Sequence, residues 1–261
     1  MSILLLLILA IIQGLTEFLP VSSSGHLVFL ENLLPMSAQK LTITAFLHLG
    51  TTLSLLFYFR KKISEIILGI FNRYGTEQQR INLHLILKII IGTIPITILG
   101  LLLKDKIDLM FTRPVYVAIF LFITGILLFL TRFAKPTRTH ISYSLALIIG
   151  CAQAIALLPG ISRSGITIAI ALLLGLNRTD SFEFSFLLSI PAVIGANILI
   201  FKDLTGNLNL INSIIAIITT FIIGLLALRL LKSVVIKNRL HYFAYYCWLI
   251  AIITTIIIGC S

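Results

Sequence analysis

Apolar residues run through the chain in long stretches, which polar side chains interrupt at only a few places. These stretches lack the alternation of polar and apolar residues that marks membrane β-strands, and they therefore predict helices. Six of them approach the roughly 20 residues that a helix needs to cross a bilayer. The predicted spans are 41–59, 83–103, 114–131, 182–201, 210–231 and 241–260.

Two further apolar segments are each broken by a polar turn. The first opens with residues 2–12, which would form about 16 Å of helix, too short for a hydrocarbon core of about 30 Å. Pro20 and a run of serines then interrupt the helix, and a short apolar stretch follows at 27–34. The second segment, 142–175, has its break at 159–167. Two short arms around a polar turn predict a re-entrant hairpin in each segment.

The two broken segments match each other at a constant spacing of 140 residues, as between Gln13 and Gln153. The same spacing joins Ser22 to Ser162. Each half of the chain thus has one hairpin followed by three spans. Because a hairpin returns to its own side of the membrane and three spans are an odd number, the second half must be inverted relative to the first.

We therefore expect an all-α polytopic membrane protein, with residues 1–261 forming a single integral membrane domain. It would contain two inverted-topology repeats, at about 1–131 and about 142–261. Each repeat would be a re-entrant helix-turn-helix hairpin plus three transmembrane helices.

The composition agrees with a membrane location and indicates which kinds of partner the protein contacts. Hydrophobic residues make up 59% of the chain and charged residues only 11%, which is unlike a soluble domain. The net charge of +11 comes from cations in short loops between the spans, so we expect contact with the bilayer and no nucleic-acid partner. Most of these cations lie in or near loops 60–82, 132–140 and 229–240. The positive-inside rule then places both termini outside, with the first hairpin opening outward.

The first break gathers the side chains that could do chemistry. Gln13 and Glu17 are four residues apart and share one helix face. The serines follow Pro20, where a half-helix begins with unpaired N–H groups that favour anions such as phosphate. The candidates at this break are Gln13, Glu17, Ser22, Ser23, Ser24, Gly25 and His26.

The second break adds a permanent cation. An arginine at membrane depth costs about 2.5–3.5 kcal/mol on insertion scales, so Arg163 needs an anionic partner, either Glu17 or a substrate phosphate. Capping serines and a purely structural ion pair are the alternative interpretations, and we interpret His48 and Glu183 as structural. Because the polar groups gather at the two breaks, we favour one shared site. The second break contributes Ser162, Arg163, Ser164 and Thr167.

These motifs resemble a known family over nearly the whole chain, in the same order. The family is that of the undecaprenyl-diphosphate phosphatases, the bacitracin-resistance membrane phosphatases. The resemblance rests on QGLTEFLPVSSSGH at 13–26, GTIPITILGLL at 92–102, LPGISRSGIT at 158–167 and FSFLLSIP at 184–191.

The resemblance implies a multi-pass enzyme of the bacterial plasma membrane. Its substrate would be a long-chain isoprenyl diphosphate lipid, undecaprenyl diphosphate, whose terminal phosphate it removes to recycle the lipid carrier for cell-wall synthesis, and the active site would open to the periplasmic side. The sequence is also compatible with a homo-oligomer.

The resemblance implies a catalytic role for Glu17, Ser23, His26 and Arg163, and substrate binding by Gln13, Ser22, Ser24, Gly25, Ser162, Ser164 and Thr167. It also implies a divalent cation, Mg²⁺ or Ca²⁺, with Glu17 as its ligand. Ser23, His26 or water could be the nucleophile. Gln13 takes the glutamine form of the family's E/Q-x-x-x-E pattern, which argues against a mechanism that needs two carboxylates there.

Two other classes of protein share parts of this pattern. Inverted repeats with broken helices are also the architecture of secondary transporters, so a lipid flippase or transporter is the main alternative. An intramembrane serine protease is a weaker alternative, because no paired histidine lies in a late helix. Glu, Ser, His and Arg together suit bond breaking better than transport.

Overall fold

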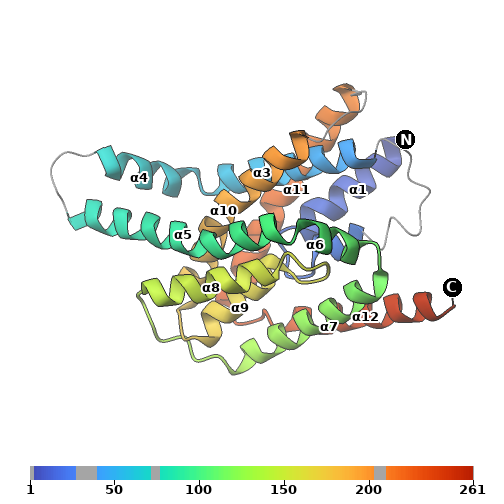
Figure 1. Cartoon of the computed structure of the whole chain (residues 1–261). Helices are drawn as coiled ribbons and strands as arrows, with labels where there is room; N and C mark the ends of the chain where they lie inside the picture. Colours follow the sequence, from blue (N-terminus) through green and yellow to red (C-terminus); the bar gives the residue numbers. More distant parts are fainter. Residues whose placement is uncertain (1–2, 28–39, 72–76, 203–209, 261) are drawn as a thin grey trace.

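A computed structural model describes residues 3–27, 40–71, 77–202 and 210–260, and these residues form helices without any β-strand (Figure 1). A single bridge between Arg138 and Leu176 joins two loops. The helices are α1 Ile3–Thr16, α3 Lys40–Tyr58, α4 Arg60–Phe71, α5 Glu77–Leu102, α6 Lys104–Phe111, α7 Pro114–Leu130, the 3₁₀ helix η1 Thr131–Phe133, α8 Tyr143–Ile155, α9 Arg163–Leu173, α10 Arg178–Lys202, α11 Leu210–Ile236 and α12 Tyr242–Cys260.

The predicted helical segments are found with small shifts in their ends. Helices α3, α7, α10, α11 and α12 cover the corresponding predicted spans, and α5 begins six residues before its prediction. The segment 142–175 is divided into α8 and α9 around a break, as expected. The first segment breaks after Thr16 and is helical again over 23–27, while the rest of its predicted second arm lies outside the described residues.

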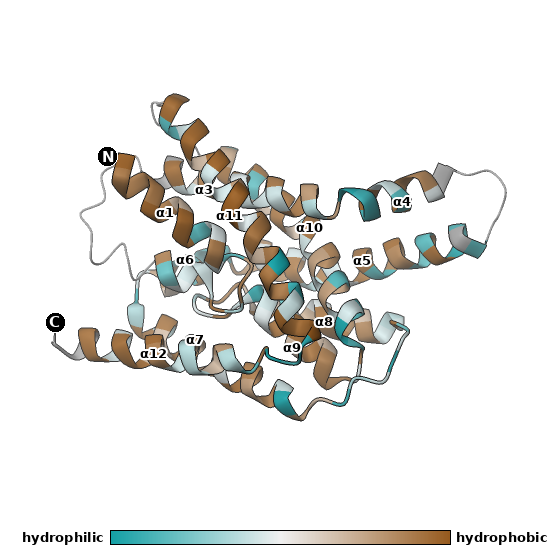
Figure 2. Ribbon diagram, turned by 180° about the vertical axis from the view of Figure 1, so that it is seen from behind, coloured by the Kyte–Doolittle hydropathy of each residue, from teal (hydrophilic) through white to brown (hydrophobic). Residues whose placement is uncertain are grey.

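Membrane character is evident from length and from the exposed surface. Among the residues described, four helices are long and apolar enough to cross a bilayer: Gln79–Leu102, Pro114–Phe133, Arg178–Lys202 and Leu210–Ile236. The two other predicted spans give shorter apolar helices, Ile43–Tyr58 and Tyr242–Ile257. Apolar residues make up much of the helices (Figure 2), and many of their large side chains are exposed, which is unusual for a soluble protein. The protein is therefore a multi-pass membrane protein.

The loop predicted at 60–82 is wrong over much of its length, because α4 and the start of α5 occupy it. Asn82 Nδ2 donates to the Glu65 carbonyl oxygen at 3.1 Å, which links the two helices. Ile66 is buried, whereas Leu68 is 66% exposed. Most of the cations that we assigned to this loop lie on the two helices, Arg60, Lys61 and Lys62 on α4 and Arg80 on α5.

Helix pairing brings distant parts of the chain together. α3 and α1 pack on α11, α5 packs on α8, and α7 packs on α12. The start of α1 and the end of α12 lie at one end of the molecule, with α4 and the beginnings of α5 and α8 at the other (Figure 1). Close backbone approach explains the α5–α8 contact, since a Cβ added to Gly150 would lie 2.2 Å from the Gly92 carbonyl oxygen.

The largest buried cluster lies beside the first break. Phe18 from the break packs edge-on against Phe186 of α10, with ring centroids 5.9 Å apart. Phe182 and Phe59 complete an aromatic group that is almost fully buried. This packing anchors the turn after α1 to α3 and α10, which fixes where the neighbouring Glu17 points.

Candidate functional site

The first break is a turn that ends in a serine cap. After α1 ends at Thr16, residues 17–21 form turns and Ser22 takes a φ of 65°, a left-handed conformation uncommon outside glycine. The Ser22 hydroxyl accepts a hydrogen bond from the Gly25 amide at 3.3 Å. Ser22 therefore caps the helical turn at 23–27, as the sequence predicts.

The second break has the same cap. The Ser162 hydroxyl accepts from the Gly165 amide at 3.2 Å and begins α9. Each capping serine also pairs with the serine two residues later: Ser22 and Ser24 hydroxyls are 3.1 Å apart, and Ser162 and Ser164 hydroxyls 3.3 Å apart. The serine matches at a spacing of 140 residues thus correspond to matching hydrogen bonds, whereas Gln153 has no partner among the described residues where Gln13 donates to Glu17.

The two breaks meet through an ion pair. Arg163, the first residue of α9, directs its guanidinium Nη2 to Oε1 of Glu17. A Cβ added to Gly165 would lie 3.2 Å from Cβ of Pro20, so the two turns are in close contact. The Glu17 side chain is 6% exposed and that of Arg163 25% exposed. A carboxylate and a guanidinium from opposite halves of the chain are therefore placed together in a largely buried setting.

The other carboxylate oxygen of Glu17 accepts two hydrogen bonds. Ser23 Oγ donates to Oε2 at 2.6 Å, and Gln13 Nε2 donates to the same oxygen at 3.0 Å. The spacing of four between Gln13 and Glu17 thus gives a direct contact. A serine hydroxyl that donates to a carboxylate is oriented to lose its proton to that carboxylate, and so can act as a nucleophile.

His48 belongs to this group, although we interpreted it as structural. Its Nδ1 atom is 3.2 Å from Gln13 Nε2 and 3.8 Å from Glu17 Oε2. Since the amide nitrogen of Gln13 is a donor, this Nδ1 atom serves as the acceptor. The signal was the group of polar residues His48, Thr51 and Thr52 inside an otherwise apolar segment. Its link to Gln13, 35 residues earlier, could only be seen once α3 was placed beside α1.

His26 faces away from the Glu17 cluster. Its Nδ1 donates to the Ser22 carbonyl oxygen at 2.8 Å, and its Nε2 accepts from the Tyr246 hydroxyl at 2.7 Å. The His26 and Tyr246 rings stack nearly parallel, 4° apart. No contact between His26 and Ser23 is found in the part of the chain described. Tyr246, which lies on α12, was not predicted as a partner of His26.

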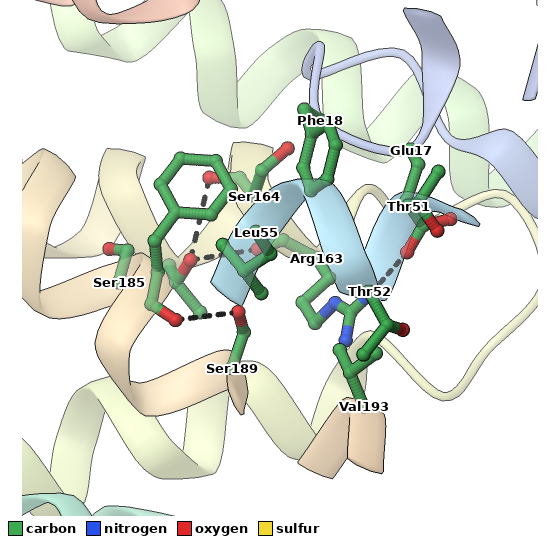
Figure 3. Close-up of a pocket in the computed structure, with 12 residues that line it drawn as sticks. Glu17, Phe18, Thr51, Thr52, Leu55, Arg163, Ser164, Ser185, Ser189 and Val193 are labelled. Carbon is green, nitrogen blue, oxygen red and sulfur yellow. Dashed lines mark hydrogen bonds and ion pairs between the residues drawn. The ribbon is translucent and has the colours of Figure 1, made fainter. Parts of the chain in front are cut away.

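A small cavity lies beside the ion pair (Figure 3). Its volume is about 10 Å³, room for about one water molecule. Ser164 and Thr167 of α9, both predicted to bind substrate, line it with Arg163 and Glu17. Residues that we did not predict complete its wall: Phe18, Thr51, Thr52, Leu55, Ser185, Phe186, Ser189 and Val193.

The cavity wall holds a hydroxyl that is free to bind. Ser185 Oγ is buried and has no hydrogen-bond partner within the described residues. Thr52 Oγ1, by contrast, accepts from Asn197 Nδ2 at 2.7 Å. Hydroxyls beside a guanidinium can complete the coordination of an anion's oxygens.

The side-chain oxygen atoms near Glu17 determine whether a metal ion could be held there. No group of three His, Cys, Asp or Glu side chains arranged for a metal occurs among the residues searched. The Gln13 Oε1 atom, however, is buried without a partner, while its amide nitrogen contacts Glu17. Mg²⁺ is commonly held by one or two protein oxygens with substrate phosphates supplying others. Gln13 and Glu17 therefore fit a cation that shares its coordination with a phosphate.

Fold and site together define a class: a polytopic helical membrane protein in which a carboxylate, an arginine and a serine hydroxyl from two helix breaks form one buried polar site. The chain belongs to the bacitracin resistance protein BacA family, whose model it matches over residues 6–253.

The chain also aligns with known proteins over nearly its full length. The chain is 37% identical to the undecaprenyl-diphosphatase of Methanobrevibacter smithii, covering 97% of this chain and 96% of the relative. It is 41% identical to that of Korarchaeum cryptofilum, covering 94% and 95%. It is 40% identical to that of Methanosphaera stadtmanae, covering 98% of each.

Proposed function

We propose that this protein is an undecaprenyl-diphosphate phosphatase, a hydrolase that converts undecaprenyl diphosphate to undecaprenyl phosphate and inorganic phosphate. Its product is the lipid carrier of cell-wall synthesis, and consumption of the diphosphate confers bacitracin resistance. The observation that carries the proposal is the Glu17 carboxylate held between Ser23 and Arg163, in a chain whose full-length relatives are named for this activity.

The geometry supports nucleophilic attack by Ser23. Its hydroxyl already donates to Glu17 at 2.6 Å, so Glu17 can take the proton as Ser23 Oγ bonds to the terminal phosphorus. The bond from that phosphorus to the bridging oxygen then breaks, and undecaprenyl phosphate leaves with the proton that Glu17 took. Water attacks the phosphoserine as Glu17 takes one of its protons. Glu17 returns this proton to Ser23 Oγ as the bond from Oγ to phosphorus breaks, so that inorganic phosphate is released and the Ser23 hydroxyl and the Glu17 carboxylate are restored.

Arg163 would hold the phosphate oxygens during both steps. A guanidinium has five N–H donors, and only the Nη2 group is engaged with Glu17 in the described residues. Arg163 lines the cavity together with Ser164 and Thr167. Positioning and charge neutralisation of this kind supply most of the catalysis in phosphoryl transfer.

His26 keeps two candidate roles in this scheme. Its Nε2 atom contacts the Tyr246 hydroxyl rather than Ser23, so Glu17 is better placed than His26 as the base. For His26 to donate a proton to the leaving phosphate, or to attack phosphorus itself, Nε2 must exchange the tyrosine hydroxyl for a substrate oxygen.

A divalent cation, Mg²⁺ or Ca²⁺, would be held by Glu17 and Gln13 together with the diphosphate. When bound, it would neutralise charge on the phosphate oxygens. Gln13 Oε1 would then gain the partner that it lacks among the described residues.

The finer architecture is part of the proposal. We propose two inverted-topology repeats with re-entrant hairpins, both termini outside the plasma membrane, and an active site that opens to the periplasmic side. The matching serine caps and the placement of both chain ends at one end of the molecule support this arrangement. A flippase or transporter that performs no hydrolysis is less well supported, because transport needs no hydroxyl paired with a carboxylate.

The test is phosphate release from undecaprenyl diphosphate by the purified protein in detergent. We expect release that falls when EDTA is added and returns with Mg²⁺ or Ca²⁺. Absence of release by the wild-type protein, with lipid movement across proteoliposomes retained, would support transport instead. Full release in EDTA would remove the cation from the proposal and leave the phosphatase assignment standing.

A further inference from the structure

A second cavity lies apart from the Glu17 site, against the last turns of α11. Its volume is about 360 Å³, within the range of small-molecule sites, and it is shallow. None of its lining residues borders the Glu17 cavity. The lining consists of Tyr58, Arg229, Lys232, Ser233, Ile236 and Lys237.

The charges around this cavity do not balance. Lys232 Nζ lies 3.9 Å from Glu183 Oε1, so one cation has an acidic partner. Arg229 and Lys237 form no ion pair within the described part of the chain. The Tyr58 hydroxyl lies within electrostatic range of both Arg229 and Glu183. The cavity thus combines excess positive charge with hydroxyl groups, a combination suited to phosphate oxygens.

An apolar strip leads from this cavity along the same face of α11. Ile218, Ile222 and Leu226 precede Arg229 at spacings of four, four and three residues, so all four side chains share one side of the helix. The three apolar residues are 52%, 50% and 53% exposed. The face therefore changes from exposed hydrocarbon to basic within one helical turn, which matches a molecule with an acyl chain and an anionic head.

We infer that this cavity binds the headgroup of an anionic phospholipid whose chain lies along Ile218, Ile222 and Leu226. Cations that merely follow the positive-inside rule would be solvated and scattered, whereas these surround a cavity that continues into an apolar strip. Basic pockets between membrane helices bind lipid headgroups by this chemistry. The lipid is held as a ligand and is not hydrolysed, so the inference stands independently of the phosphatase proposal.

The test is native mass spectrometry of the detergent-purified protein, titrated with dioleoyl phosphatidylglycerol or dioleoyl phosphatidylcholine. The variant Arg229→Gln/Lys237→Gln leaves the Lys232–Glu183 contact intact. Removal of each cation should weaken binding about fivefold, so the double variant should bind phosphatidylglycerol about 25-fold more weakly. The matched control Arg132→Gln/Lys135→Gln removes equal charge from another predicted cytoplasmic loop, and its binding should be unchanged.

Three results would overturn the assignment. Equal weakening in both double variants would mean that diffuse surface charge attracts the lipid. Equal binding of phosphatidylcholine would remove the role of the anionic head, and displacement of phosphatidylglycerol by inorganic phosphate would identify a free-phosphate site. Phosphate release from undecaprenyl diphosphate, measured in parallel, should be the same in both variants, so that loss of lipid binding is distinguished from loss of the enzyme.

Discussion

The two helix breaks are built alike but carry different chemistry. In each, a serine caps the following helix and pairs with the serine two residues later. After the cap, the first break presents Ser23 and the second presents Arg163, while Glu17 has Leu157 as its counterpart. The serine caps, which both breaks share, determine the backbone conformation of the turns and the start of the helices that follow. The residues that differ are the proposed nucleophile, the proposed base and the arginine that pairs with it, so the proposed reaction depends on what the two breaks do not share.

The largest effect is expected from a substitution that removes the ion pair between the two breaks. Glu17→Gln removes the proposed base and should lower phosphate release by about 10²–10⁴-fold. It also leaves Arg163 unpaired. Unfolding should become easier by about 2 kcal/mol, less than for a fully buried pair, because a quarter of the Arg163 side chain is exposed.

The double variant Glu17→Gln/Arg163→Gln separates stability from catalysis. It should recover part of the lost thermal stability in detergent while remaining inactive. Full activity in Glu17→Gln would contradict the proposed mechanism, and an inactive Glu17→Gln with unchanged stability would show that the ion pair contributes nothing to the fold.

Substitution of Ser23 tests a residue that the first break does not share with the second. Ser23→Ala should lower phosphate release by about 10²–10⁴-fold, because it removes the hydroxyl that donates to Glu17. Ser24→Ala is the matched control, since that hydroxyl contacts Ser22 instead, and it should lose less than tenfold. Mass spectrometry of a quenched reaction should show the phosphorylated protein with wild-type Ser23 only. Comparable losses in the two variants would argue for water or His26 as nucleophile.

A smaller effect is expected where His26 contacts α12. Tyr246→Phe removes the hydroxyl bound to His26 Nε2. Because Nε2 must release this hydroxyl before it can contact the substrate, kcat should rise by up to about tenfold, the worth of roughly one hydrogen bond. Tyr245→Phe is the control, because Tyr245 makes ring contacts only within the described residues. A Tyr246→Phe variant with wild-type kcat would show that release of this hydroxyl does not limit the reaction.

The smallest effect concerns the shared caps. Ser162→Ala should cost about 1 kcal/mol of stability through loss of the cap. Ser22→Ala should cost about the same, because serine and alanine both carry a Cβ and bear the same backbone strain at a φ of 65°. Ser22→Gly relieves that strain and should cost only a few tenths of a kcal/mol. Thermal unfolding of the three variants in detergent checks the order. A loss at Ser22→Gly as large as that at Ser22→Ala would mean that the left-handed turn carries no cost.

The sequence predicted the helices and both breaks because long apolar runs and proline or serine interruptions are local signals. The Glu17–Arg163 pairing was predicted as one option, since a buried arginine needs an anion. His48 and Tyr246 could not be placed, because their partners depend on which helices pack together. The segment that contains α4 was predicted as a loop because it lies between two apolar runs of membrane length, and its helix is supported by packing on α5.

Each break is also held by a helix from the other half of the chain. Thr124 of α7 donates from its hydroxyl to the Gly160 carbonyl oxygen and accepts from the Ser162 amide. Cys247 of α12 donates from its thiol to the Pro20 carbonyl oxygen at 3.4 Å. The first turn is thus completed by a helix 227 residues further along the chain. A chain without α12 would keep every proposed reactive side chain but lose a contact that holds the first turn, so the position of Ser23 and Glu17 depends on a helix that supplies neither.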